Sequence, residues 1–561
     1  MGEKWVAPDG RPARGARWMR ATWRNLPAGP YRVGCEAGLA VPGADGDPLL
    51  TDHYFPRAAG EPAGEDFPTL LVRSPYGRGV PWAPLYGILF AEQGFHVVVQ
   101  SCRGTGGSGG AFHFWRNEEA DGHAAVAWLR QQPWFNGALG TIGASYQGYL
   151  QWLLAQDPPP ELRAMVVQVG LHDPYAYFHG GGALHLENAL VSGTGMAHQH
   201  RGNGDFLRAA LRLRRWLRRA DRLPARGGTR PGEPYATDGP AGELPWLAEL
   251  LTLTDGADPY WRGAAAEVAA GRRTVPTCLV GGWQDVFADQ TIEQYRRLRA
   301  AGGRTALLIG PWTHASAFRQ GWPEVFAESL AWLRAQLCGE RAGLRPSPVR
   351  VHVGAAGGAG AWRELADWPP APGGAAGRWY PTAEHGLGRR APGGAAPVGE
   401  FRHDPADPTP SVGGPLLTPG AGRRDNRALE ARADVLTFTG PALAEPLEVL
   451  GPVAARLRVT ADGAPDGRSF DLFARLCEVD ARGRSVNVCD GLVRVRGGAV
   501  EPREAVVSMG SAAHRFAAGH RMRLQISGGA FPRFAPPTAA PDGGTAPVRV
   551  VLHPGSALEL P

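Results

Sequence analysis

The stretch that decides the fold is Gly140-Thr141-Ile142-Gly143-Ala144-Ser145-Tyr146-Gln147-Gly148-Tyr149-Leu150-Gln151-Trp152. The short apolar segment before Ser145 predicts a strand, and the residues after it predict a helix. A serine between such elements lies in a strained turn that needs small neighbours, because the two backbones approach closely. The turn exposes the serine hydroxyl at the carboxyl edge of the sheet. The backbone NH of Tyr146 can then face the negative charge that develops when a carbonyl is attacked.

One position departs from the usual Gly-x-Ser-x-Gly pattern of this turn. Gln147 stands where the second glycine is expected, and Gly148 follows it. Because Gly-x-Ser is a common tripeptide, an ordinary strand-to-helix turn remains the alternative to a nucleophile elbow. The strand before the serine and the helix after it favour the elbow, with Ser145 as the nucleophile.

Apolar segments alternate with helical patterns on both sides of this stretch. Such alternation is typical of parallel βαβ units. Strands are predicted at 70–72, 96–100 and 140–143 with a crossover helix at 119–129, and further strands at 277–283 and 305–309 with a helix at 291–300.

A serine needs a base to act as a nucleophile, and the base needs a third group to orient it. In α/β hydrolases these groups follow in the order Ser, Asp or Glu, His, each on a loop after a strand. Asp285 and His314 follow two of the predicted strands in this order. We therefore expect an α/β-hydrolase fold with His314 as general base and Asp285 as its orienting residue. Asp289 is the rival of Asp285, and we expect it in the first turn of the following helix.

The chain is too long for one hydrophobic core, because single folds rarely exceed about 250 residues. The βα alternation stops near Val167, and helical periodicity disappears beyond Pro346. Period-two strands at 456–459 and 521–526 indicate a β-sandwich, whereas the Gly- and Pro-rich stretch 354–424 is expected to be mostly loop. The predicted domains are a hydrolase core in two parts at 1–166 and 263–345, a helical cap insertion at 167–262, and a C-terminal β-sandwich at 346–561.

The predicted cap carries a row of arginines at steps of four, three, four and three residues. This spacing places them on one helix face. A solvated face is the first interpretation, and a surface for an anionic substrate or a partner is the second. The row consists of Arg208, Arg212, Arg215, Arg219 and Arg222.

Composition excludes several other functions. The formal charge of +6, from 59 Lys and Arg against 53 Asp and Glu, is small for 561 residues and predicts no nucleic-acid partner. The first residues lack the apolar core of a secretory signal, and no stretch approaches the roughly 18 apolar residues of a membrane span. We expect a cytoplasmic protein without a membrane partner; its oligomeric state is open.

Neither the cysteines nor the histidines predict a metal or cofactor. The six cysteines fall in no zinc-ligand spacing, and we expect them to be reduced and buried. Cys477 and Cys489 flank a turn, so adjacent strands are expected there, with a disulfide as the less favoured alternative. His198 and His200 form an HxH pair, but no further ligands lie near it in the sequence.

The sequence as a whole resembles the CocE/NonD hydrolases. These are cocaine esterase-like enzymes related to X-Pro dipeptidyl-peptidases and α-amino-acid ester hydrolases. The resemblance covers nearly the whole chain after Tyr31. It is carried by Arg73-Ser74-Pro75-Tyr76, Arg103-Gly104 with Ser108-Gly109-Gly110, Gln132-Pro133-Trp134, Gly143-x-Ser145-Tyr146-x-Gly148, Gly282-Trp283-x-Asp285, Gly310-Pro311-Trp312-x-His314, Asp490-Gly491-x-x-Arg494 and Phe531-Pro532-Arg533-Phe534.

The resemblance implies more than the residues alone do. It implies that the Tyr76 hydroxyl joins the Tyr146 NH in an oxyanion hole, although composition alone assigns Tyr76 to packing. It also implies that the C-terminal domain is a jelly roll. Phe287 would line the acyl pocket, with core packing an equal alternative, and Trp152 is a weaker pocket candidate for which packing is favoured. Departures at Ser101-Cys102 and Ala530 weaken inferences about the substrate and leave the triad intact.

The expected function is hydrolysis of a small carboxylic ester or amide through a Ser-His-Asp triad and an acyl-enzyme. X-Pro dipeptidyl-peptidase activity is one alternative, and it would need carboxylates in the cap to hold a free α-amino group. The cap is richer in arginine than in acids, which favours esters, although Glu187 remains available. An acyltransferase would use the same triad, and a non-catalytic binding protein on a hydrolase fold is the hypothesis outside the enzyme class.

Overall fold

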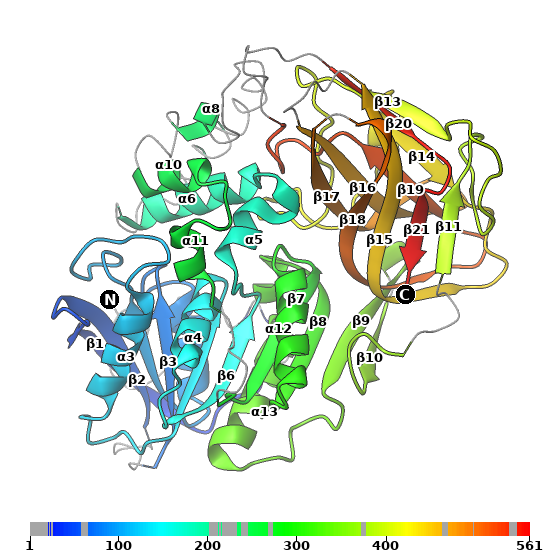
Figure 1. Ribbon diagram of the computed structural model, residues 1–561. Coiled ribbons are helices and arrows are strands. Elements are labelled where there is room, and N and C mark those ends of the chain that lie inside the picture. The colour runs from blue at the N-terminus through cyan, green and yellow to red at the C-terminus, as the bar shows by residue number, and fades with distance from the viewer. Residues whose placement is uncertain are drawn as a thin grey trace.

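The computed structural model describes residues 21, 23, 26–57, 66–200, 211, 215, 233–236, 245–266, 273–358, 360–371, 377–462, 469–497, 499–537 and 547–561. The chain forms an α/β-hydrolase core with a helical cap insertion and a C-terminal β-sandwich, as the sequence predicted (Figure 1). The core and the sandwich lie side by side, and the cap lies above the core in the view of Figure 1.

The core is built on one twisted sheet with the strand order β1-β2-β4-β3-β5-β6-β7-β8-β9-β10. The strands from β3 to β9 run parallel, whereas β1, β2 and β10 pair antiparallel. The bounds are β1 Arg32–Pro42, β2 Pro48–Arg57, β3 Thr69–Ser74, β4 His96–Ser101, β5 Leu139–Ala144, β6 Leu162–Gln168, β7 Thr277–Gln284, β8 Thr305–Thr313, β9 Val349–Ala355 and β10 Ala361–Leu365.

Helices cover both faces of this sheet, because its central strands are apolar on both sides. One buried cluster joins the sheet to α3 (Glu118–Leu129), α4 (Tyr146–Gln156) and α12 (Ala288–Ala300). A second cluster on the opposite face includes α2 (Leu89–Ala91) and α13 (Trp322–Leu333). The core strands and helices predicted from the sequence are confirmed, whereas the strands β1, β2, β6, β9 and β10 and the helices α2 and α13 were not anticipated.

The cap leaves the sheet after β6 and returns before β7. Its described helices are α5 (Pro174–His179), α6 (Leu186–His200), α8 (Glu233–Ala236), α10 (Pro245–Thr252) and α11 (Pro259–Ala264). Of the predicted arginine row, only Arg215 lies among the described residues, where it is exposed. The other four arginines lie outside the described residues, so neither interpretation of the row is tested.

The C-terminal part packs two antiparallel sheets around their own core. In one sheet β15 pairs with β18, β20 and β21, while β11 pairs with β21 and β13 with β20; the other has the order β14-β19-β16-β17. The bounds are β11 Gly377–Pro381, β12 Leu387–Gly388, β13 Gly399–His403, β14 Val435–Thr439, β15 Leu447–Asp462, β16 Ser469–Val479, β17 Ser485–Arg496, β18 Ala499–Phe516, β19 Arg521–Ser527, β20 Val548–Leu552 and β21 Ala557–Leu560; the short helix α14 spans Arg427–Glu430.

Several details differ from the expectations. The described residues of the stretch 354–424 include the strands β10 to β13, which the glycines and prolines around them made unrecognisable in the sequence. All six cysteines are free, and Cys477 and Cys489 lie on the adjacent strands β16 and β17, but Cys338 is exposed and Cys35 only partly buried. Strand β9 pairs with β8 and also with β18, so it joins the core to the sandwich. The domain boundary at 345/346 remains a prediction.

Candidate active site

Ser145 lies between β5 and α4 in a backbone conformation that L-residues rarely adopt, with φ 58° and ψ −123°. The strain depends on close packing around the turn. A Cβ added to Gly143 would lie 2.6 Å from Cβ of Gln147, and one added to Gly148 would lie 2.9 Å from Cγ1 of Val167. The turn thus has the geometry of a nucleophile elbow, with its glycines at positions that admit no side chain.

Gln147, which stands at the expected second glycine, connects the elbow to its surroundings. Its side-chain Oε1 accepts a hydrogen bond from the Ala144 NH at 3.0 Å, and its Nε2 donates to Oγ of Ser74 at 3.1 Å. The same Ser74 oxygen accepts the Tyr76 NH at 3.1 Å. Gln147, which departs from the usual motif, therefore links the turn that carries Ser145 to the segment that carries Ser74 and Tyr76.

Tyr76 follows β3 and places its hydroxyl beside the serine. The hydroxyl donates to Oγ of Ser145 at 3.2 Å and accepts the Tyr146 NH at 3.4 Å. The Tyr76 ring stacks on Trp82 with centroids 5.6 Å apart. Burial raises the pKa of Tyr76, so its hydroxyl stays protonated and able to donate. The two groups assigned to the oxyanion hole are thus brought together at Ser145.

Asp285 and His314 form a pair at the carboxyl ends of β7 and β8. Nδ1 of His314 lies 2.8 Å from Oδ1 of Asp285, whose side chain is completely buried. The Phe287 ring meets the imidazole edge-on with centroids 5.5 Å apart. Because Nδ1 is bound to the carboxylate, Nε2 is the nitrogen left to exchange a proton with another group. Asp289 lies in the first turn of α12, as expected, and its carboxylate lies beside Gly510 of β18.

No hydrogen bond joins Ser145 to His314, both of which the structure describes. The serine hydroxyl is engaged by Tyr76 instead. Contacts between catalytic groups are often long without substrate and tighten when it binds. The structure therefore brings the predicted residues together as two pairs, Tyr76 with Ser145 and Asp285 with His314.

The side chain of Tyr146 is buried and packs against Trp115. Its hydroxyl donates to Oε1 of Glu118 at 3.3 Å and accepts the Trp115 NH at 3.0 Å. Its ring stacks on Trp115 with centroids 4.9 Å apart. Fixing both the ring and the hydroxyl restrains the residue whose backbone NH faces Tyr76.

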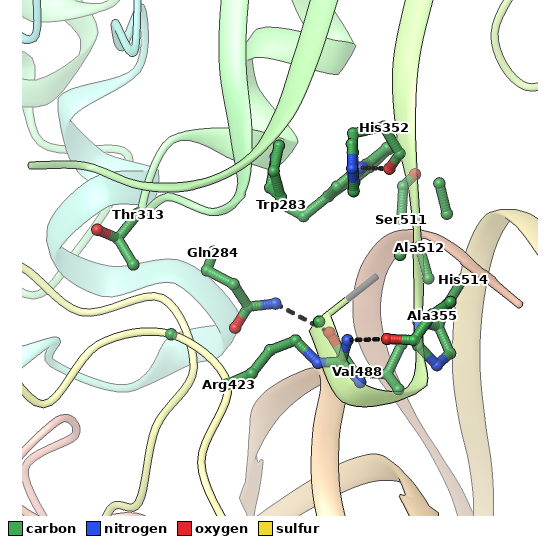
Figure 2. Close-up of a pocket in the computed structure, with 15 residues that line it drawn as sticks. Trp283, Gln284, Thr313, His352, Ala355, Arg423, Val488, Ser511, Ala512 and His514 are labelled. Atoms are coloured by element: carbon green, nitrogen blue, oxygen red, sulfur yellow. Dashed lines mark hydrogen bonds between the residues drawn. The ribbon is translucent and has the colours of Figure 1, made fainter. Parts of the chain in front are cut away.

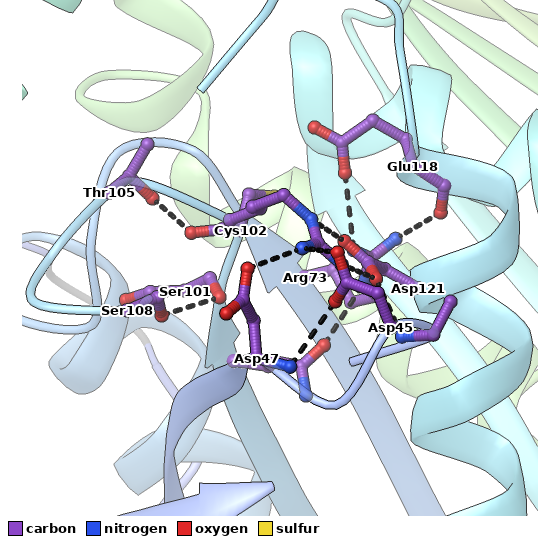
Figure 3. A network of polar contacts seen from close by, with 12 residues as sticks. Asp45, Asp47, Arg73, Ser101, Cys102, Thr105, Ser108, Glu118 and Asp121 are labelled. Atoms are coloured by element: carbon purple, nitrogen blue, oxygen red, sulfur yellow. Dashed lines mark hydrogen bonds and ion pairs between the residues drawn. The ribbon is translucent and has the colours of Figure 1, made fainter. Parts of the chain in front are cut away.

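Glu118 belongs to a network of buried charges (Figure 3). Arg73 donates from Nη2 to Oε2 of Glu118 at 3.1 Å, and Arg103 pairs with Asp121 at 2.7 Å. Arg103 also pairs with Asp45 and Asp47 near the surface. Burial raises the pKa of Glu118. The sequence alone does not reveal this role of Glu118, because its partners come from distant parts of the chain.

Apolar and aromatic residues lie close to the His314 pair. Phe287 is buried, and its ring centroid lies 4.9 Å from that of Tyr177 in the cap. This placement beside His314 is compatible with both the acyl-pocket and the packing interpretation. Trp152 is buried in the same apolar cluster, seven residues along α4 from Ser145 and about 10 Å away at 1.5 Å per residue. Its position favours packing.

A loop of the C-terminal sandwich also contacts the cap and the apolar cluster that contains Phe287. The Thr418 NH donates to Oε1 of Glu187 on α6 at 3.3 Å, and Leu417 packs against the cluster that contains Phe287. Burial raises the pKa of Glu187. Both the cap and the sandwich therefore contribute residues near Phe287. From the sequence such a contribution was expected only of the cap.

Within the described part of the chain, no three His, Cys, Asp or Glu side chains are grouped to hold a metal ion. The side chains of His198 and His200 lie outside it. None of the described helices is long and apolar enough to span a membrane.

Comparison with known proteins points to one group of enzymes. Residues 45–316 match the X-Pro dipeptidyl-peptidase (S15) family, and residues 343–546 match the X-Pro dipeptidyl-peptidase C-terminal non-catalytic domain. The chain is 28% identical to the cocaine esterase of Rhodococcus sp. (strain MB1 Bresler), over 89% of this chain and 91% of that protein.

Two solved structures share the fold over nearly the whole chain. An α-amino acid ester hydrolase superposes with a TM-score of 0.77 at 21% identity, covering 96% of this chain and 98% of that one. A CocE/NonD family hydrolase from Staphylococcus aureus gives a TM-score of 0.67 at 17% identity, covering 94% and 93%.

Proposed function

Because this chain belongs to the CocE/NonD family of serine hydrolases, we propose that it cleaves carboxylic esters through an acyl-enzyme formed on Ser145. The observation that carries the proposal is the Tyr76 hydroxyl, which lies 3.2 Å from Oγ of Ser145 and 3.4 Å from the Tyr146 NH. A carbonyl oxygen bound there would receive two hydrogen bonds beside the attacking serine.

Acylation begins when an ester carbonyl displaces the Tyr76 hydroxyl from its contact with Ser145. His314 takes the Ser145 proton at Nε2 while Oγ attacks the carbonyl carbon, and the developing oxyanion accepts from Tyr76 and the Tyr146 NH. His314 then gives the proton to the leaving alcohol. Asp285 keeps the imidazole oriented through its 2.8 Å contact with Nδ1 and stabilises the imidazolium without taking the proton itself.

Deacylation repeats these steps with water in place of the serine. His314 removes a proton from water, the hydroxide attacks the acyl carbon, and the proton returns to Oγ of Ser145. The same two donors stabilise the second tetrahedral intermediate. The products are a carboxylic acid and an alcohol.

An ester suits this site better than an X-Pro peptide. A dipeptidyl-peptidase must neutralise a free ammonium group, which needs an ionised carboxylate near the acyl pocket. Glu187 is the cap acid that contacts the sandwich loop, and its Oε1 already accepts a hydrogen bond from the Thr418 NH at 3.3 Å. The apolar and aromatic surroundings of Phe287 and Tyr177 favour an uncharged acyl group instead.

The test compares p-nitrophenyl acetate and butyrate with Ala-Pro-p-nitroanilide, using the wild type and Ser145→Ala. We expect ester turnover with a burst of p-nitrophenol, and its loss in Ser145→Ala. Preferential cleavage of the anilide would replace the proposal by X-Pro dipeptidyl-peptidase activity. Undiminished turnover in Ser145→Ala would remove the serine from its proposed role.

A further inference from the structure

The residue before Asp285 lies where the hydrolase sheet meets the C-terminal sandwich (Figure 2). Gln284 is the last residue of β7. Its partner on β8 is Thr313, which precedes His314. Gln284 is buried, and Figure 2 shows its side-chain amide directed at Val488 of the sandwich. The two residues next to the Asp285–His314 pair therefore lie together at the boundary between the two domains.

The amide of Gln284 is bound by a strand of the sandwich. Nε2 donates to the Val488 carbonyl at 3.0 Å, and Oε1 accepts from Nδ2 of Asn487 at 3.4 Å. Both partners belong to β17, and they lie 204 and 203 residues further along the chain. A buried amide with its donor and its acceptor both bonded keeps one orientation, because any other would leave a buried polar group unpaired. The end of β7 is thereby fixed to the sandwich.

Asn487 is itself held in place, and its partners reach the neighbour of His314. It is completely buried, its Nδ2 also donates to the Gly422 carbonyl at 3.2 Å, and its Oδ1 accepts the Arg424 NH at 2.7 Å. A Cβ added to Gly422 would lie 3.3 Å from Cγ2 of Thr313. One sandwich residue thus connects Gln284 to a segment that lies against Thr313.

The Asp285 carboxylate depends on its main chain for orientation. Oδ1 lies 2.8 Å from Nδ1 of His314, whereas Oδ2 is buried and has no hydrogen-bond partner in the described part of the chain. The Asp285 NH donates to the Gly282 carbonyl at 3.0 Å, so a tight turn follows the strand. A carboxylate with one hydrogen bond is not held at its other oxygen. A shift of the end of β7 would therefore move Oδ1 relative to the imidazole.

A second contact holds the same strand end within the hydrolase core. Nε1 of Trp283 donates to the His352 carbonyl on β9 at 2.8 Å. The end of β7 is thus held on two sides, by β9 through Trp283 and by β17 through Gln284. Losing the Gln284 contact would leave the strand paired in its sheet but free to shift at its end.

We infer that Gln284 is a positioning residue through which the C-terminal sandwich holds the Asp285 carboxylate toward Nδ1 of His314. The roles of Asp285 and His314 in catalysis rest on the proposed function, whereas the contacts of Gln284 do not. The inference gives a part in catalysis to a domain whose family description is non-catalytic.

The experiment combines low-field proton NMR with ester kinetics on Gln284→Met, which keeps the side-chain length and removes both hydrogen bonds. The proton between His314 and Asp285 gives a low-field resonance, assigned by its absence from Asp285→Asn. We expect this resonance to move upfield in Gln284→Met. The kcat for p-nitrophenyl acetate should fall at least tenfold, because a misplacement of about 1 Å can cost about 100-fold, and KM should change less.

Gln294→Met is the matched control. Gln294 is buried on α12, the helix that follows Asp285, and its amide has no hydrogen-bond partner in the described part of the chain. Its resonance and its kcat should equal those of the wild type. Thermal unfolding of both variants shows whether either one is merely less stable.

Asn487→Ala tests the contact from the side of the sandwich. It should lower kcat less than Gln284→Met does, because the Val488 carbonyl remains as a partner. Within the Gln284→Met background it should cost less than in the wild type, since two residues in one contact have effects that do not add. Equal losses in the two backgrounds would show that Asn487 and Gln284 act independently and would overturn the inference.

The NMR result separates this inference from the proposed function. An unchanged resonance in Gln284→Met would make Gln284 a structural contact and overturn the positioning role, even where Ser145→Ala is inactive. Absence of the resonance from the wild type would leave no pair to orient and would overturn it as well. Ester turnover retained by Ser145→Ala would instead count against the proposed function.

Discussion

The side-chain amide of Gln147 donates to Oγ of Ser74 at 3.1 Å, and that oxygen also accepts the Tyr76 NH. These contacts connect the turn that carries Ser145 to the turn that carries Tyr76. The distance between the proposed nucleophile and its oxyanion donor therefore depends on a glutamine at a position where many hydrolases have glycine.

Replacing Gln147 by methionine should lower kcat for p-nitrophenyl acetate by about tenfold to 100-fold, because a misplacement of about 1 Å can cost that much. KM should change less, since the acyl pocket is unaltered. Gln151→Met is the control. Gln151 is also buried on α4, and its amide bonds with Thr141, Val166 and the carbonyls of Gly143 and Gln147, but it does not reach Ser74. Equal kcat values for the two variants would contradict the positioning role.

Replacing Tyr76 by phenylalanine should reduce kcat by about 100- to 1000-fold, the usual effect of losing one oxyanion donor. Its ring can keep its stacking on Trp82, so thermal unfolding should change little. Tyr295→Phe is the control, because the Tyr295 hydroxyl donates to Asp367 at 2.8 Å, away from the serine. Full ester turnover by Tyr76→Phe would remove the hydroxyl from the oxyanion hole.

Two neighbouring aspartates allow a direct test of the orienting residue. Asp285→Asn should lower kcat by about 10⁴-fold, because asparagine favours the wrong imidazole tautomer. Asp289→Asn should retain most of the turnover, since the Asp289 carboxylate lies beside Gly510 of β18, whereas Nδ1 of His314 is bound by Asp285. The measurement is steady-state ester hydrolysis of both variants, and a larger loss in Asp289→Asn would reverse the assignment.

The residues of the site could be predicted from sequence to different extents. Ser145, Asp285 and His314 follow strands in a characteristic order, so local patterns were sufficient to propose them as the triad. The roles of Gln147 and Glu118 were not predictable, because Ser74 and Tyr146, their partners, lie 73 and 28 residues away and the contacts exist only in the folded chain. In the fold, the five-residue strands β11 and β13 were too short to show a period among glycines and prolines.

The buried carboxylate of Glu478 predicts how stability depends on pH. Burial alone would raise its pKa, but hydrogen bonds from His514, the Ala517 NH and His520 outweigh burial and lower the pKa to about 2. A carboxyl whose pKa is lower in the folded state stabilises that state above its unfolded pKa, and the stabilisation is lost as the pH falls toward the folded pKa. For Glu478 the loss should run from about pH 4.5 to about pH 2.

Thermal unfolding of the wild type and Glu478→Gln should therefore differ most near pH 6, with the variant less stable, and the difference should shrink as the pH falls toward 3.5. Glu340→Gln is the control. Glu340 is exposed and pairs with Arg334 at 3.9 Å, and exposed pairs contribute only about 0–1 kcal/mol. A stability difference that stayed constant from pH 6 to pH 3.5 would mean that the Glu478 carboxylate is not held by its histidine and backbone donors.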